Sequence, residues 1–148
     1  MMEPSVLALL EDTPEVLVEL PRFSVVKRRS DGTVDFISPF PCPFNYGCIP
    51  ALTSGDGDPL DALVLGPRLP RGTRLRVPVV AVFNFHDEGA ADPKVICSPR
   101  GLSASDARDL RRFFALYARF KRMLSRARGG RGDVRALGFL PETAWRRA

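Results

Sequence analysis

Alternating apolar and polar residues dominate the first third of the chain. Residues 14–21 read PEVLVELP, an alternating run closed by proline that is typical of a half-buried strand. Two short β-prone runs follow, SVVKRRS at 24–30 and TVDFIS at 33–38, and a Ser-Asp-Gly turn signal joins them. The pattern predicts further strands at 61–65, 73–85 and 94–98.

A proline-rich segment interrupts this pattern. Residues 39–50, PFPCPFNYGCIP, contain four prolines, and each of them lacks a backbone N–H donor. The segment therefore predicts an extended, rigid connection, and it argues against both a regular helix and a central strand.

The period changes to that of an amphipathic helix between residues 103 and 128. Apolar residues recur there at helical spacing: Leu110, Phe113, Phe114, Tyr117, Phe120 and Leu124. Ser103 or Ser105 is placed to cap the start, and Gly129-Gly130 ends the pattern. We expect one domain over residues 1–148, α+β or mainly β: a small closed barrel of mostly antiparallel strands with this long helix packed on it.

Composition narrows the setting of this domain. The 148 residues are 45% apolar and 26% charged, as in globular proteins, and no apolar run reaches the roughly 18 residues of a membrane span. The amino terminus lacks the pattern of a secretory signal. Three cysteines without metal-type spacing then read as reduced thiols of a cytoplasmic protein.

The net charge of +5 is concentrated late in the chain. From Arg100 onward 13 Lys and Arg face four Asp and Glu. Such a tail fits a solvated helix face, a field that attracts a polyanionic small molecule, or a nucleic-acid surface. No aromatic stacking motif accompanies it, so the nucleic-acid interpretation ranks last, with Phe83 and Phe85 as its only aromatic candidates.

Two acidic turns carry the candidate chemistry. The first is DGDPLD at 56–61, and the second is DEGAADPK at 87–94. Asp, Gly and Pro are ordinary turn residues, but turns alone do not require so many carboxylates beside apolar strands. Carboxylates in excess of local bases are ligands for Mg²⁺, with Mn²⁺ as the alternative. A calcium loop is argued against by Pro59 and by the missing glutamate at the twelfth loop position.

These motifs resemble the soluble (family I) inorganic pyrophosphatases. NYGCI at 45–49, SGDGDPLDALVL at 54–65 and HDEGAADPKVI at 86–96 match the family pattern in order and spacing. The resemblance implies an oligonucleotide-binding-like barrel, Mg²⁺-dependent hydrolysis of pyrophosphate to two orthophosphates, no membrane association, and a cytoplasmic homo-oligomer, a hexamer among bacterial members.

The resemblance also assigns roles to individual positions. Asp58 orients and deprotonates the attacking water, with Asp56 and Asp87 beside it in the catalytic centre. The metal ligands and their supporting acid are Asp56, Asp61, Asp87, Asp92 and Glu19; the substrate-binding residues are Lys27, Tyr46, Lys94 and Tyr117. From the residues alone, Lys27 reads equally as an exposed strand residue, and Tyr117 as a core tyrosine.

Three positions depart from the family pattern. An acid is replaced by Arg29, a phosphate-binding arginine is missing near Val34, and a lysine is replaced by Ala118. Losing charge-assisted phosphate contacts costs roughly 10²–10³ in rate unless another cation compensates. Candidates for that compensation are Arg28, Arg29, Arg119 and Arg122. The alternatives to a pyrophosphatase are therefore a weak or silent metal- and anion-binding subunit and a hydrolase of another phosphoanhydride.

Overall fold

The computed structural model describes residues 6–24, 26–28, 31, 33–37, 42–54 and 57–146, and the structural statements below concern these residues. The first half contains a 3-10 turn η1 (Val6–Leu9) and strands β1 (Glu15–Leu20), β2 (Val26–Arg28), β3 (Val34–Ile37), β4 (Asn45–Thr53) and β5 (Pro59–Val64). The second half contains β6 (Arg74–Arg76), β7 (Val79–Asp87), β8 (Ala90–Ala91), β9 (Lys94–Cys97), α1 (Ala104–Ala127), β10 (Val134–Phe139) and a 3-10 turn η2 (Glu142–Ala144).

The main sheet is mostly antiparallel, as the sequence predicts. Its order is β10-β7-β9-β5-β4-β1-β6, β8 pairs with β7, and only the β5–β9 pairing is parallel. Strands β2 and β3 form a separate hairpin. In the described part of the chain the path is open, with β10 and β6 at its two edges, so the predicted closed barrel is not confirmed.

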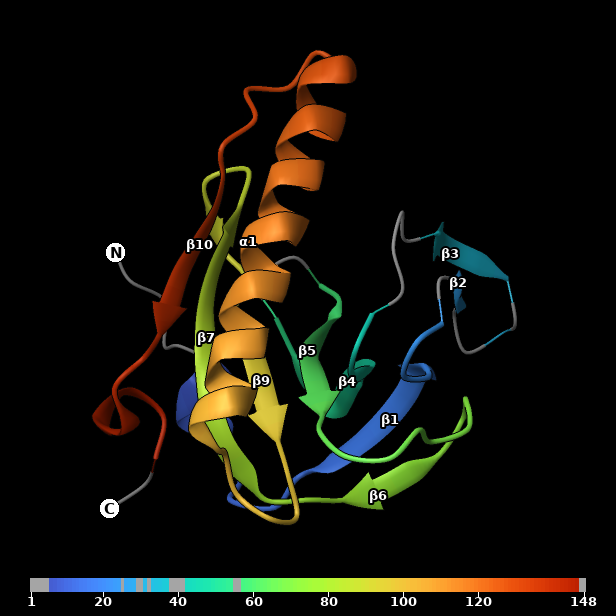
Figure 1. Cartoon of the computed structure of the whole chain (residues 1–148), viewed down its shortest axis with the longest axis vertical. Helices are drawn as coiled ribbons and strands as arrows, with labels where there is room; N and C mark the ends of the chain where they lie inside the picture. Colours follow the sequence, from blue (N-terminus) through green and yellow to red (C-terminus); the bar gives the residue numbers. More distant parts are fainter. Residues whose placement is uncertain are drawn as a thin grey trace.

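The predicted long helix is confirmed as α1. Ser103 caps its start, accepting a hydrogen bond from the Asp106 N–H at 3.0 Å, while the Asp106 carboxylate accepts from the Ser103 N–H at 3.1 Å. This reciprocal capping box satisfies two backbone donors that a helix start leaves without partners. Figure 1 shows α1 running alongside β7 and β10, away from β6 and the β2–β3 hairpin. No helix in the described part is both long and apolar enough to cross a membrane.

The hydrophobic core has two layers, one on each face of the sheet. Between the sheet and α1, Phe83 and Phe114 stack with ring centroids 4.5 Å apart. The second layer includes Val16, Val82 and Trp145 and packs toward η1. Phe83 and Phe85 are 2% and 0% exposed, so neither ring is available for stacking on a nucleic-acid base.

Two local predictions differ from the structure, and one strand was missed. Residues 45–50 form part of a central strand, β4, because the ladder to β5 is regular from Asn45 to Ile49 and becomes irregular only beyond it, where Pro50 lies exposed. The run 73–85 is split into β6 and β7 around Pro78, which cannot donate to a ladder. Strand β10, which follows the helix, was not predicted at all.

Candidate active site

Four side chains from the two acidic turns and the NYG motif converge at one end of the sheet. The Lys94 ammonium donates to Asp61 Oδ2 at 2.6 Å and to Asp92 Oδ2 at 2.8 Å. The Tyr46 hydroxyl donates to the same Asp61 oxygen at 3.2 Å. We call Tyr46, Asp61, Asp92 and Lys94 the acid–lysine cluster. The sequence-predicted residues of this cluster are therefore brought together, although their assigned roles stay predictions.

Sheet register explains this convergence. Ala62 of β5 pairs in parallel with Val95 of β9, so the preceding residues, Asp61 and Lys94, lie at the same end of the two strands. The short β7–β8 turn then returns the chain so that Asp92 follows β8 directly, and its N–H donates to the Phe85 carbonyl at 2.7 Å. The only parallel pairing in the described sheet thus places both acidic turns beside one lysine.

The NYG motif supports the cluster from β4. The buried Asn45 amide donates to the carbonyls of Val64 and Pro67 and accepts from the N–H groups of Arg22 and Leu69, which satisfies the amide fully. At Gly47, a Cβ would lie 1.8 Å from the Leu17 carbonyl oxygen, so only glycine allows β1 to approach this closely. Asparagine and glycine thereby fix the strand from which Tyr46 reaches Asp61.

Burial and charge set the protonation states of the cluster. Burial raises the pKa of the Tyr46 phenol well above its usual value, and the Asp61 carboxylate raises it further. The phenol therefore remains a hydrogen-bond donor. Burial lowers the pKa of the Lys94 ammonium, but Tyr46, Asp61 and Asp92 more than offset this, and the pKa lies well above the usual lysine value. Lys94 is thus a permanent cation in a site with only 3% of its side chain exposed.

A second ion pair extends the site toward α1. Lys121 donates to Asp87 Oδ2 at 2.6 Å, and its ammonium lies 5.6 Å from the centroid of the Tyr117 ring. Burial lowers the pKa of Lys121, but Tyr117 and Asp87 outweigh burial and raise it overall. The positive charge of Lys94 opposes this rise in the pKa of Lys121. Tyr117 itself packs against the Phe85 and Phe113 rings.

Lys121 is the residue of this site that sequence reasoning missed. It follows Tyr117 by four positions, and residues at that spacing share a helix face. That spacing is the one signal that could have identified it, because a single lysine in a basic helix otherwise reads as a solvated residue.

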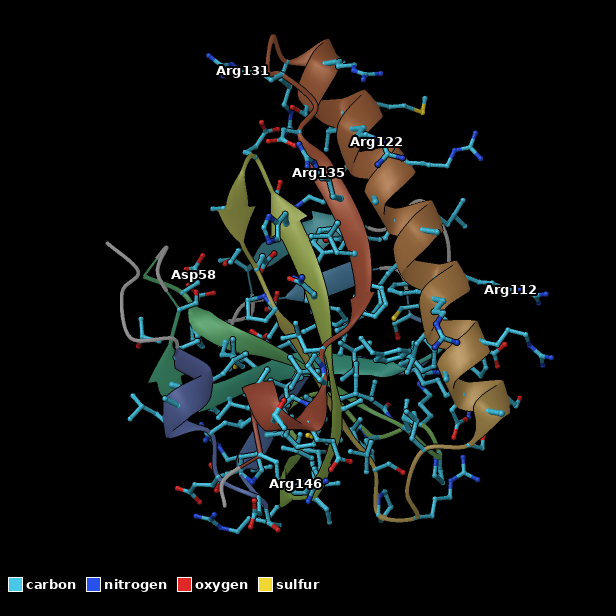
Figure 2. All side chains as sticks on the ribbon, turned by 90° about the vertical axis from the view of Figure 1, so that its left-hand side faces the viewer. Asp58, Arg112, Arg122, Arg131, Arg135 and Arg146 are labelled. Atoms are coloured by element: carbon cyan, nitrogen blue, oxygen red, sulfur yellow. The ribbon has the colours of Figure 1, made fainter. Side chains whose placement is uncertain are left out.

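The remaining sequence-predicted residues are not drawn into the cluster. Asp58 is exposed at the β4–β5 turn, where Ser54 donates to its backbone carbonyl, and Figure 2 shows it on the opposite side of the view from Arg112 on α1. Glu19 is half-buried on β1. Asp56 and the side chain of Lys27 lie outside the described part of the structure.

The structure also locates the positions that depart from the family pattern. Val34 is 50% exposed on β3, whereas Ala118 is 1% exposed inside the core, where a lysine ammonium would lose its hydration. Arg122 donates to the Val134 carbonyl at 2.8 Å, and Arg119 is exposed. Neither arginine forms an ion pair with an acid in the described part of the chain. Arg28 and Arg29 have side chains outside the described residues.

A groove of about 390 Å³ lies near the amino-terminal half of α1 and shares no residue with the cluster. Its rim carries Arg22, Arg100 and Arg112, but Asp106 and Asp109 stand beside them and offset much of the positive charge. The groove therefore offers no strong anion site.

Asp87 and the two acids of the acid–lysine cluster suit a divalent cation. Asp61, Asp87 and Asp92 supply hard carboxylate oxygens, which Mg²⁺ and Mn²⁺ prefer. Among the described residues no three acids, histidines or cysteines are already gathered around one metal position. The carboxylate oxygens fit such a metal by their chemistry.

Known proteins share the fold and the motifs. The sequence profile of the inorganic pyrophosphatases matches residues 16–128. The chain is 38% identical over 97 residues to an inorganic pyrophosphatase of Saccharolobus solfataricus, covering 60% of this chain and 56% of that protein, and 37% identical over 92 residues to one of Gluconobacter oxydans, covering 57% and 53%.

Solved structures agree with this result. The inorganic pyrophosphatase of Helicobacter pylori superposes with a TM-score of 0.71 at 25% identity, over 90% of this chain and 87% of that one. The aligned region spans about half the length of the curated relatives. The profile covers most of the chain and includes both acidic turns. The chain belongs to the inorganic pyrophosphatase family.

Proposed function

We propose that this protein hydrolyses inorganic pyrophosphate to two orthophosphates with the help of Mg²⁺. The observation that carries the proposal is the convergence of Asp61 and Asp92 on the buried Lys94, with Tyr46 on the same carboxylate. Membership of the family and the names of the matched relatives support the same reaction. In this reaction one P–O–P bond breaks, the water oxygen forms a new P–O bond, and the released protons pass to the orthophosphates and solvent.

The side chains of this site act mainly by position and charge. Lys94 holds one oxygen of each carboxylate, which fixes the position of both groups. Tyr46 fixes the same Asp61 oxygen from β4. Phosphoryl transfer depends on such preorganised charge more than on covalent chemistry by the protein.

A divalent cation, when bound, lowers the pKa of a water molecule and neutralises phosphate oxygens. Asp61, Asp87 and Asp92 would hold it together with Asp56, and Glu19 would support them. We propose Mg²⁺, with Mn²⁺ as the alternative, because the candidate ligands are all carboxylates and both ions bind through such hard oxygen donors.

Asp58 is the proposed general base. It lies exposed on the same turn that leads into β5 and Asp61, so a substrate phosphate held at the cluster could bring water within its reach. Tyr46, Tyr117, Lys27 and Lys94 are the proposed contacts for the phosphate oxygens.

The test is orthophosphate release from pyrophosphate with Mg²⁺ by the natural protein and by Asp92→Asn. Asp109→Asn, a carboxylate on α1 with its side chain 51% exposed, is the matched control. We expect Asp92→Asn to lose at least 10²-fold in rate, because a ligand and the Lys94 contact are both weakened, and Asp109→Asn to retain the natural rate. Equal rates for the two variants would reject the proposed site. If none of the three proteins releases orthophosphate, pyrophosphate is rejected as the substrate and the silent-subunit alternative is favoured.

Two wider properties rest on the family resemblance. We propose a cytoplasmic homo-oligomer, with a hexamer as the expected size. Light scattering coupled to size-exclusion chromatography measures that size directly, and a monomeric mass would contradict the proposal.

A further inference from the structure

We infer that Lys121 is a substrate-binding residue of this site, and that it shares Asp87 with the metal: it holds Asp87 in the absence of a cation and turns to a phosphate oxygen when a cation binds. This inference rests on the proposed function, because the anion in question is pyrophosphate.

The two lysines of the site differ in exposure and in the number of carboxylates that they contact. Lys94 has 3% of its side chain exposed and contacts two carboxylates, so only one of its three donors is left for a phosphate oxygen. Lys121 has 26% exposed and contacts one carboxylate, Asp87, which is itself 29% exposed. A lysine ammonium carries three donors on a flexible stem, so Lys121 retains donors for an incoming phosphate.

Helix α1 holds Lys121 firmly at the site. One turn before it, the Tyr117 ring lies under its ammonium. One turn after it, the Ser125 hydroxyl donates to Glu88 Oε1 in the β7–β8 turn and accepts from the Gly132 N–H. The carboxy-terminal half of the helix is therefore tied to the turn that follows Asp87. Lys121 is positioned by the fold and is not a freely solvated residue.

The net charge of the site gives Lys121 opposite effects on a cation and on an anion. Asp61, Asp87 and Asp92 face two ammonium groups, Lys94 and Lys121, so the described part of the site carries one excess negative charge. Removing Lys121 makes the site more negative, which favours a divalent cation and disfavours a polyanion. Lys121 and a metal ion would also compete for the Asp87 carboxylate. The inference therefore predicts opposite effects on the two ligands, whereas a purely structural ion pair would not.

The experiment uses the full chain with Lys121→Met, Lys121→Arg and the control Arg108→Gln, which removes one positive charge from the same helix at a side chain that is 59% exposed. Binding of Mn²⁺ alone is measured by calorimetry, and KM for pyrophosphate is measured at saturating Mg²⁺. We expect Lys121→Met to bind Mn²⁺ about threefold to thirtyfold more tightly and to raise KM about tenfold. Lys121→Arg should keep KM within about threefold, and Arg108→Gln should change neither quantity.

Unchanged or weaker Mn²⁺ binding by Lys121→Met would overturn the inference, and so would an unchanged KM. If Lys121→Met does not fold, as judged by circular dichroism, Lys121→Gln is measured in its place under the same criteria. The Mn²⁺ titration needs no turnover. If the natural protein fails to hydrolyse pyrophosphate, the proposed function fails, while the competition between Lys121 and the metal is still decided by calorimetry.

Discussion

Replacing Lys94 by methionine tests how the acid–lysine cluster is held together. Methionine has an unbranched side chain of similar length, but it lacks the ammonium with which Lys94 contacts Asp61 and Asp92 at 2.6 and 2.8 Å. Breaking a buried ion pair costs about 3–5 kcal/mol, because the remaining charge is left without a partner. The two carboxylates are 23% and 26% exposed, so water screens part of this cost and we expect a loss of about 2–3 kcal/mol.

The expected loss is large enough to measure by thermal unfolding. For a chain of 148 residues, 1 kcal/mol shifts Tm by about 2–4 °C, so Lys94→Met should melt about 5–10 °C below the natural protein. Mg²⁺ should then raise Tm more in the variant than in the natural protein, because two carboxylates without a cation gain more from binding one. The control is Arg74→Met, which removes an exposed pair with Glu15 at 2.9 Å; it should cost at most about 1 kcal/mol and should keep the Mg²⁺ response of the natural protein.

Two results would refute this reasoning. A Tm for Lys94→Met equal to that of Arg74→Met would show that the ion pairs contribute no more than surface pairs. An identical Mg²⁺ response in the natural protein and in Lys94→Met would show that Asp61 and Asp92 do not bind the cation.

Three further predictions concern the rest of the chain. Val34→Arg, at a position 50% exposed, should leave Tm within about 2 °C and raise kcat/KM for pyrophosphate about tenfold; an unchanged kcat/KM would show that this hairpin does not face the substrate. Burial raises the pKa of the Cys42 and Cys97 thiols from 9.0 to about 12, so the folded state keeps protons that the unfolded state loses. The free energy of unfolding that these thiols contribute is therefore full below pH 9 and should fall between about pH 9 and 12, by about 1.4 kcal/mol per pH unit for each thiol. Urea titrations of Cys97→Ala should show a smaller dependence of this free energy on pH, and an unchanged dependence would contradict the prediction. Gly47→Ala places a methyl group 1.8 Å from the Leu17 carbonyl oxygen and should abolish cooperative unfolding in the near-ultraviolet circular dichroism signal, whereas a natural-like transition would show that β1 moves freely.

The sequence predicted most elements whose pattern is set by one buried face. Strand β1 alternates buried and half-buried residues along EVLVEL, and α1 buries Leu110, Phe113 and Phe114 at helical spacing. In both elements local pattern and tertiary packing agree, so the period alone identified them.

Elements that depend on neighbouring strands were harder to predict. Strand β4 contains Pro50, and only the irregular ladder beyond Ile49 shows how a central strand tolerates it. Strand β10 combines Arg135 and Gly138 with a broken register, so its pattern does not alternate cleanly, and its pairing with β7 is visible only in three dimensions.

The residues of the candidate site could likewise be predicted from the sequence only in part. The motifs identified Asp61, Asp92 and Lys94 because those residues lie in short, distinctive runs of sequence. Their convergence required the parallel β5–β9 pairing, which no local pattern encodes. Lys121 meets Asp87 across 34 positions of sequence, so the contact depends on how α1 packs and could not be deduced from the basic helix alone.

The most direct measurement of the central claim is phosphorus magnetic resonance of pyrophosphate incubated with the protein and Mg²⁺. We predict that the natural protein converts all of the pyrophosphate into orthophosphate. Asp58→Asn should slow this conversion by at least about 10²-fold, because the general base is lost. A persistent pyrophosphate signal with the natural protein would contradict hydrolysis, and equal conversion by both proteins would contradict the role of Asp58.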